Sequence, residues 1–258
     1  MTDSEQQPEE IIETTEVVEA MDVYVRGSAL PGYKGYCPIT ETFVYRQPDG
    51  SYLDGSYNAK LSESDFLEPP GFLVVHLGSI ERDYTVETAA NALFNSLKSL
   101  FAACDIPVDF ERIRTTVELS EFMKMYRANY SHLILIGHGS TDGISFLDKP
   151  SPIGGSELAG CLGSDQCSKP LQIISLCCHS GCKNLSAALS NADNVTDVIA
   201  PNDEFDMRWA VHFVTGFLLY QFIENMTVDD ALKNAAKNSG SAPMCVWRNA
   251  ELTGTCAT

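Results

Sequence analysis

From Phe72 onward, short continuous apolar runs alternate with stretches of helical periodicity. Apolar runs without polar alternation are typical of strands buried on both faces of a parallel sheet. The predicted strands are Phe72–Leu77, Arg112–Val117, His132–Ile136, Leu171–Leu176, Asp197–Ala200 and Cys245–Arg248. The predicted helices are Glu87–Cys104, Leu119–Tyr130, Gly155–Cys161, Cys182–Ala192, Phe205–Asn225 and Val228–Lys237. This repetition predicts an α/β fold, a three-layer α/β/α sandwich with a mostly parallel central sheet and right-handed crossovers.

The first 70 residues differ from the rest in composition. Residues 1–20 contain one Asp and six Glu but no Lys or Arg, which predicts a disordered acidic tail. Residues 21–70 are rich in tyrosine, and the turn Pro48-Asp49-Gly50 separates two short β-prone runs, which predicts a hairpin. We therefore expect a disordered tail over 1–20, a small β-rich N-terminal appendage over 21–70, and an α/β domain over 71–258.

The charge balance and the cysteine content restrict the ligands and the compartment. Seventeen Lys and Arg against 35 Asp and Glu give a formal net charge of −18, so the basic surface that nucleic acid or an anionic membrane requires is not visible. The nine cysteines are scattered through a chain that is long enough to bury a core without disulfides. The N-terminus shows no secretory signal, and no run approaches about 18 apolar residues. We expect a cytoplasmic protein with free thiols that binds neither nucleic acid nor membrane.

Two of the predicted strands are followed by residues whose side chains can take part in catalysis. The run His132–Ile136 leads into Gly137 and then His138-Gly139, and the run Leu171–Leu176 leads into Cys177-Cys178. Ligands of an open parallel sheet bind outside the carboxyl ends of its strands. If the two strands are neighbours, His138 and Cys178 meet at one edge of the sheet.

A cysteine and a histidine at one edge can perform nucleophilic catalysis. A thiolate attacks a carbonyl carbon, and an imidazole takes the thiol proton and later gives a proton to the leaving amine. Gly139 leaves room for a substrate backbone, and the N–H groups of Gly139 and Cys178 can bind the developing oxyanion. This mechanism requires neither a metal ion nor an organic cofactor.

The two motifs resemble those of a known protease family. A strand followed by His138-Gly139, and a later strand followed by Cys178-His179-Ser180-Gly181, resemble the caspase-like cysteine peptidases of clan CD, and most of all the CHAT branch. The segment from Val198 to Glu204, with the two helical stretches after it, is similar to the region that follows the nucleophile in this family. The similarity covers roughly residues 72–248. The Gln-Ala-Cys-Arg-Gly signature of true caspases is absent, so their specificity for aspartate is not implied.

The resemblance implies a fold, an activity and partners. It implies a caspase-like sandwich and a thiol protease that hydrolyses a protein substrate, with Cys178 as nucleophile and His138 as general base and acid. Family members commonly act as regulated endopeptidases, several of them in bacterial programmed death or antiviral defence. A protein substrate and an activating protein partner are therefore the expected partners.

Acidic residues near the predicted site suggest a preference for a basic substrate residue. Asp203 and Asp206 follow the Asp197–Ala200 strand, and Asp142 follows His138. A carboxylate in the substrate pocket would attract Arg or Lys at the position before the cut and repel acidic residues. Asp203 and Asp206 also lie where a helix is predicted to begin, so capping is the alternative role for both.

Three alternatives remain open from the sequence. Cys177 lies next to Cys178, and the side chains of adjacent strand residues point to opposite faces, so one thiol is expected to pack inside the fold. The chain could instead be a catalytically silent caspase-like module that binds a partner. It could also be a zinc-stabilised α/β scaffold, since thiolate and imidazole are the usual zinc ligands. The candidate ligands would be Cys161, Cys167, Cys177, Cys178, His179 and Cys182.

Overall fold

The computed structural model describes nine stretches of the chain. They are residues 33–37, 42–46, 52–54, 60–61, 71–78, 84–104, 106–162, 169–239 and 243–256. The predicted acidic tail over 1–20 lies outside these residues and stays a prediction. The chain divides into two compact units, Met1–Pro69 with Phe101–Ile106, and Pro70–Leu100 with Pro107–Thr258.

The first unit contains a four-stranded antiparallel sheet. Strands β1 (Tyr33–Cys37), β2 (Thr42–Arg46), β3 (Tyr52–Asp54) and β4 (Lys60–Leu61) pair in chain order. The pairing of β2 with β3 confirms the predicted hairpin strands, while the turn residues 47–51 lie outside the described stretches. The appendage as a domain with bounds 21–70 stays a prediction.

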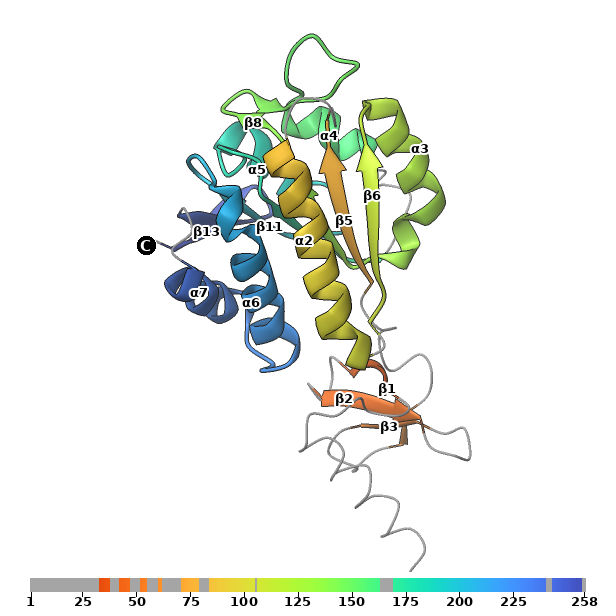
Figure 1. Ribbon diagram of the computed structural model, residues 1–258. Coiled ribbons are helices and arrows are strands. Elements are labelled where there is room, and N and C mark those ends of the chain that lie inside the picture. Colours follow the sequence, from red (N-terminus) through yellow and green to blue (C-terminus); the bar gives the residue numbers. More distant parts are fainter. Residues whose placement is uncertain are drawn as a thin grey trace, which may run out of the picture. The chain divides into compact units, whose positions relative to one another are not determined.

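The second unit is built on a seven-stranded sheet (Figure 1). The order across the sheet is β13-β12-β11-β10-β7-β5-β6, in which β6, β5, β7, β10 and β11 run parallel and β12 and β13 are antiparallel to their neighbours. This sheet confirms the predicted α/β fold with a mostly parallel centre. The strands span β5 Phe72–Leu77, β6 Val108–Ile113, β7 His132–Ile136, β10 Leu171–Ser175, β11 Val195–Pro201, β12 Met244–Arg248 and β13 Glu251–Cys256.

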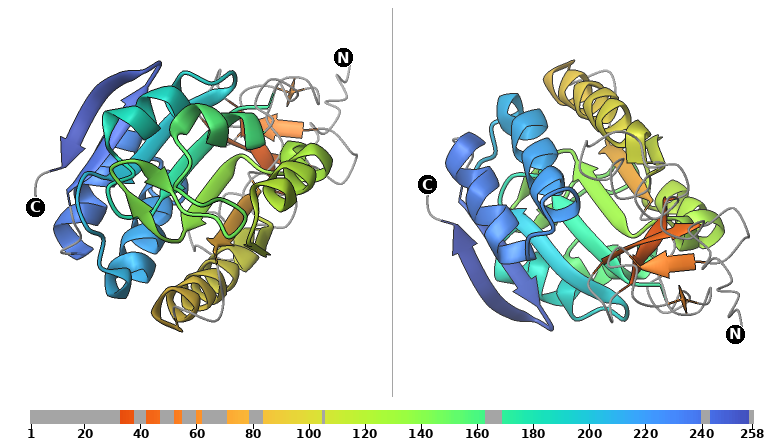
Figure 2. Two further views of the ribbon diagram at one scale, coloured as in Figure 1. Left: turned by 90° about the horizontal axis from the view of Figure 1, so that it is seen from above. Right: turned by 90° about the horizontal axis from the view of Figure 1, so that it is seen from below.

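The strand order determines which face each crossover helix covers. The chain moves one way across the sheet from β5 to β6, and then back past β5 to β7, β10 and β11. Right-handed crossovers therefore place α2 on one face and α3, α4 and α5 on the other, as Figure 2 shows. These helices span α2 Tyr84–Phe101, α3 Thr116–Tyr126, α4 Gly155–Cys161 and α5 Lys183–Ser190.

The face beneath α3, α4 and α5 holds one continuous apolar core. Alternate strand residues point into it, as the period of two requires, and each of the three helices contributes buried leucines. Members from the strands are Leu73, Val75, Leu133, Leu135, Leu171, Ile173, Val198 and Ala200, and members from the helices are Leu119, Leu158, Leu185 and Leu189. This core fixes the carboxyl ends of the central strands, where the candidate residues lie.

Helices α6 (Ala210–Phe222) and α7 (Val228–Ser239) cover the opposite face together with α2 (Figure 2). Phe213 and Phe217 of α6 are fully buried, and the Ser96 hydroxyl of α2 lies 3.2 Å from the Thr215 hydroxyl of α6. Both faces of the central strands are thus covered, which explains why their sequences lack polar alternation. No helix within the described stretches is long and apolar enough to cross a membrane.

One predicted strand was misplaced. The prediction Arg112–Val117 is wrong, because the strand spans Val108–Ile113 and helix α3 begins at Thr116. Thr115 and Glu118 form a capping box: the Glu118 N–H donates to the Thr115 hydroxyl at 3.0 Å, and the Thr115 N–H donates to the Glu118 carboxylate at 3.1 Å. The capping box ends the extended segment before Thr116 and begins the helix there.

The start of the longest predicted helix was also misplaced. The prediction Phe205–Asn225 is corrected to a 3₁₀ turn over Met207–Trp209, followed by α6. The Asp206 carboxylate accepts from the Arg208 N–H at 3.0 Å and caps the 3₁₀ turn. Residues 202–206 are therefore a loop at the carboxyl edge of the sheet and not helix.

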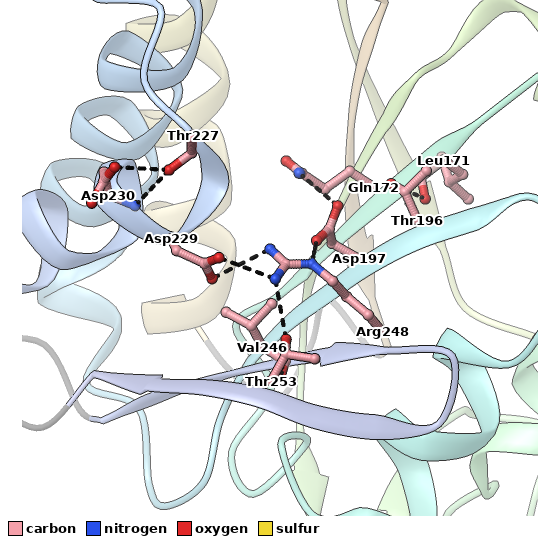
Figure 3. A network of polar contacts seen from close by, with 10 residues as sticks. All are labelled: Leu171, Gln172, Thr196, Asp197, Thr227, Asp229, Asp230, Val246, Arg248 and Thr253. Carbon is pink, nitrogen blue, oxygen red and sulfur yellow. Dashed lines mark hydrogen bonds and ion pairs between the residues drawn. The ribbon is translucent and has the colours of Figure 1, made fainter.

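A polar network joins β11, β12 and α7 (Figure 3). Arg248 donates to the buried Asp197 at 2.5 Å and to Asp229 of α7 at 3.1 Å. The Asp197 carboxylate also lies 3.5 Å from the Gln172 amide, and Gln172 is paired in register with His132 on the next strand. A polar row from Arg248 to His132 thus crosses the four strands β12, β11, β10 and β7 on the face that α6 and α7 cover.

Burial makes the imidazole of His132, at the end of this polar row, a poor base. His132 is buried between the rings of Phe72 and Phe222, at centroid distances of 5.0 Å, and its Nδ1 lies 2.8 Å from the Ser131 hydroxyl. Burial lowers the pKa of His132 from 6.5 to about 3, because the charged imidazolium loses its hydration. The folded protein therefore keeps this side chain neutral.

We predict that His132 contributes to acid unfolding. Between pH 6.5 and about 3, His132 binds a proton in the unfolded chain but not in the folded state. The free energy of unfolding should therefore fall as the pH falls through this window. The variant His132→Leu, which cannot titrate, should show a flatter dependence. Urea unfolding at several pH values measures both slopes, and equal slopes for the two proteins would contradict the assignment.

Candidate active site

The candidate site lies beside the place, between β5 and β7, where the direction of the chain across the sheet reverses. Strand β7 pairs in parallel with β5 on one side and with β10 on the other. Ser175 is in register with Leu135, and the Leu176 N–H donates to the Leu135 carbonyl at 2.8 Å. Both strands therefore end at the same level of the sheet, beside the switch point where open α/β sheets bind their ligands.

Gly139 packs directly against the two cysteines that follow β10. A Cβ atom at Gly139 would overlap the carbonyl oxygen of Cys178 and would lie 2.9 Å from the Cβ of Cys177. Only glycine permits this approach without displacing the backbone. Cys178 is part of this close contact, and His138 precedes Gly139 in the chain. The contact therefore brings His138 and Cys178 to the same edge of the sheet.

A small hairpin holds the His138 segment in place. Strands β8 (Gly139–Ser140) and β9 (Gly143–Ile144) pair antiparallel, and the Ser145 N–H donates to the His138 carbonyl at 3.1 Å. Gly143 has φ of +145°, a conformation that favours glycine, and its backbone lies against Ile153. Ile144 and Ile153 exchange backbone hydrogen bonds at 3.0 and 2.9 Å, which fasten the hairpin to the core, while the His138 side chain is exposed.

The two adjacent cysteines have opposite environments. Cys177 is fully buried in the apolar core, and burial raises the pKa of its thiol to about 12. Cys178 is partly exposed. A nucleophile needs access and thiolate character, so Cys178 is the better candidate of the two.

The residues after Cys178 form a tight turn. His179 has a positive φ of 58°, a conformation that only a few per cent of residues other than glycine adopt, and the Ser180 N–H donates to the Cys177 carbonyl at 3.2 Å. The buried Ser180 hydroxyl donates to the same carbonyl at 2.6 Å. Gly181 donates to the Pro201 carbonyl at 2.7 Å and accepts from the Trp247 indole at 2.9 Å. The turn is thus fixed on several sides, and a left-handed residue next to a candidate nucleophile is a pattern found at functional sites.

Residues 202–206 run alongside this turn. The His179 N–H donates to the Asp203 carbonyl at 3.0 Å, and the His179 imidazole Nδ1 lies 4.0 Å from the Asp203 carboxylate. The Phe205 N–H points at the Cys178 Sγ at 3.3 Å. This loop therefore contacts the candidate nucleophile itself.

The acidic candidates for substrate binding differ in their surroundings. Asp206 pairs with the Arg208 guanidinium, and hydrogen bonds from Arg208 hold the pKa of its carboxyl below the usual range. The Asp203 carboxylate is 75% exposed and accepts from the Glu204 N–H at 2.8 Å. Asp142 is exposed near the tip of the β8–β9 hairpin. Asp206 thus has the capping role, whereas Asp203 and Asp142 are exposed to solvent.

Asp148, a further acidic residue after His138, has a structural role. Its carboxylate accepts from the Thr116 N–H at 3.0 Å and from the Thr116 hydroxyl at 2.7 Å, which caps the start of α3. These hydrogen bonds lower the pKa of Asp148 against the opposing effect of burial. Asp148 is accordingly fixed to the scaffold.

The zinc alternative finds no ligand set among the residues that the structure describes. Within them, no three His, Cys, Asp or Glu side chains are grouped so that they could hold a metal ion. Cys167, one of the six candidate ligands, lies outside the described residues. Cys161 is half-buried, and burial raises the pKa of its thiol, which disfavours the thiolate that zinc requires.

The chain was compared with known proteins at the level of sequence and of structure. No protein-family model and no curated protein matches the sequence. Among solved structures, the chain is similar to an inactive zymogen C11 protease from Parabacteroides distasonis, with a TM-score of 0.48 and 12% sequence identity. The match covers 70% of this chain and 62% of that one.

Nothing in the sequence predicts the contact between the Phe205 backbone and the Cys178 sulfur. Phe205 belongs to an apolar and acidic stretch that predicts a helix, and nothing in it indicates that its backbone approaches the Cys178 sulfur. Only the Cys-x-Ser-Gly motif indicates the turn, and the roles of its Ser180 and Gly181 become clear from their hydrogen bonds.

We predict that Gly139→Ala destabilises the protein, because the new methyl group has no space beside Cys177 and Cys178. The expected loss is about 2 kcal/mol of unfolding free energy, typical of an overpacked site. Gly160→Ala is the matched control, since a Cβ at Gly160 meets nothing outside its own helix within 4 Å. Urea unfolding measures both, and a Gly139→Ala variant as stable as the control would mean that the close contact is absent.

Proposed function

We propose that this chain is a cysteine endopeptidase that hydrolyses a protein substrate, with Cys178 as nucleophile and His138 as general base and acid. The observation that carries the proposal is the packing of Gly139 against the Cys177–Cys178 backbone. It joins the ends of two parallel strands so that an exposed imidazole and an accessible thiol share one edge of the sheet. The burial of Cys177 supports Cys178 as the reacting member of the pair.

The proposed reaction has two halves. His138 takes the proton from the Cys178 thiol as the sulfur attacks the scissile carbonyl carbon, and the C–N bond breaks as His138 returns the proton to the leaving amine. Water then attacks the thioester, giving its proton to His138, and the Cys178 sulfur leaves and regains a proton. The N–H groups of Gly139 and Cys178 are the proposed donors to the oxyanion in both halves. No metal ion or organic cofactor takes part.

The finer features of the proposal rest on the resemblance to caspase-like peptidases. The Cys178-His179-Ser180-Gly181 turn supports the CHAT branch, and with it a role in bacterial defence or programmed death. A cytoplasmic location, a protein substrate and an activating protein partner are parts of the same proposal, and direct binding of nucleic acid or membrane is not. Asp203 and Asp142 are the proposed substrate-binding carboxylates, with Asp206 of less weight because Arg208 already pairs with it.

Substitution of each cysteine separates catalysis from stability. Cys178→Ala should abolish cleavage of a casein or peptide-library substrate and leave the unfolding free energy nearly unchanged, because its thiol lies at the surface of the turn. Cys177→Ala should keep turnover and lose about 1 kcal/mol of stability, since it opens a small cavity in the core. Wild-type turnover by Cys178→Ala would contradict the proposal. A folded wild type without turnover would favour a silent interaction module.

Substrate charge tests the proposed pocket. A fluorogenic peptide panel that varies only the residue before the cut should show a preference for Arg or Lys. Asp203→Asn should lower kcat/KM for the Arg peptide about fivefold, because an exposed ion pair contributes no more than about 1 kcal/mol. Glu204→Gln is the matched control, since it removes the same charge from the next exposed residue. A preference for Asp or Leu, or an equal effect of both substitutions, would remove Asp203 from the pocket.

A further inference from the structure

The Cys178 sulfur lies against the backbone of Phe205. The Phe205 N–H points at Sγ at 3.3 Å, and the Phe205 carbonyl oxygen lies 3.9 Å from the same sulfur. The shorter contact has the sulfur as acceptor, and the longer one has the thiol as a weak donor. The two contacts respond oppositely to loss of the thiol proton: the first strengthens on a thiolate, and the second disappears.

Hydrogen bonds from the turn after Cys178 to residues 201–203 hold the Phe205 N–H in place. Gly181 donates to the Pro201 carbonyl at 2.7 Å, and His179 donates to the Asp203 carbonyl at 3.0 Å. On the other side, the Asn202 N–H donates to the Pro243 carbonyl at 3.1 Å. The loop is therefore attached both to the cysteine turn and to the segment before β12, so the Phe205 N–H does not depend on the substrate for its position.

The Phe205 side chain provides a second anchor. It is 4% exposed and packs edge-on against the ring of Phe213 in α6, with centroids 6.2 Å apart. The ring lies in the core while the backbone of the same residue faces the sulfur. Burial of an aromatic ring contributes enough to fix the local backbone without help from the reacting groups.

We propose that the Phe205 N–H stabilises the Cys178 thiolate as a fixed donor that is separate from His138. The inference rests on the proposed role of Cys178 as nucleophile and adds a residue to its machinery. A preorganised N–H aimed at a developing negative charge favours the charged form, as amides do at an oxyanion. The loop after β11 thus acts on the nucleophile as well as bordering the substrate.

Alkylation by iodoacetamide reports the thiolate directly, without a peptide substrate. The S–C bond forms as the C–I bond breaks, iodide leaves with the electron pair, and the thiol proton has already passed to His138 or to the buffer. Peptide mapping separates Cys178 from the other thiols. The rate against pH gives the midpoint at which Cys178 becomes reactive.

Phe205→Pro removes the N–H, and Phe205→Ala removes the same ring but keeps the N–H. Relative to Phe205→Ala, the proline variant should show its alkylation midpoint about one pH unit higher and a neutral-pH rate about tenfold lower, since a hydrogen bond to a charged group is worth about 1.5 kcal/mol. Equal midpoints in the two variants would overturn the inference, even if both retain peptidase activity.

A measurement on the wild-type protein does not depend on the folding of a variant. In protein labelled with ¹⁵N-phenylalanine, the Phe205 amide is assigned as the signal that is lost in Phe205→Leu. Its proton should shift downfield with pH, following the alkylation midpoint of Cys178, and should not shift in this way in Cys178→Ala. A Phe205 amide proton whose chemical shift does not change as Cys178 titrates would contradict the inference. Loss of substrate cleavage alone would count only against the peptidase function.

Discussion

The close approach of the backbone at Gly139 to the Cys177–Cys178 peptide is the contact on which the site depends. It requires a residue without a side chain after His138 and places two parallel strands so that they end at one level. The order of the sheet makes these strands neighbours, and right-handed crossovers leave their carboxyl ends uncovered by the helices that connect them. A thiol and an imidazole that are far apart in the chain therefore lie at one edge.

Adjacent residues around this contact have different surroundings and different structural roles. Cys177 fills the core while Cys178 remains accessible, and Ser180 and Gly181 fix the turn through the Cys177 carbonyl, Pro201 and Trp247. The same turn holds the 202–206 loop through backbone hydrogen bonds. The loop then reaches the sulfur through Phe205. Backbone hydrogen bonds thus connect the turn after Cys178 with the loop, and the Phe205 backbone lies against the Cys178 sulfur.

The sequence allowed the sheet to be predicted, because buried parallel strands have continuous apolar runs. It also allowed the prediction that His138 and Cys178 follow neighbouring strands, which the pairing of β7 with β10 confirms, while their catalytic roles stay a prediction. It misplaced the edge strand β6, because the mixed polar and apolar sequence Val-Asp-Phe-Glu-Arg-Ile gives a weaker signal than the continuous apolar runs of the buried strands. The Thr115 capping box sets the end of this strand. Capping at Asp206 delayed helix α6 to Ala210. The Phe205 contact was unpredictable, because it is made by backbone atoms that any residue possesses.

The central claim is that Cys178 is a nucleophile activated by His138, and covalent labelling tests it most directly. A peptidyl chloromethyl ketone carries a carbonyl that the site should recognise and an adjacent chloromethyl carbon. The Cys178 sulfur attacks this carbon and is alkylated, as the S–C bond forms and chloride leaves with the electron pair of the C–Cl bond. After peptide mapping, the account predicts the label on Cys178 in the wild type and its loss in His138→Ala. A label on Cys177, or labelling of Cys178 at an unchanged rate without His138, would contradict the account.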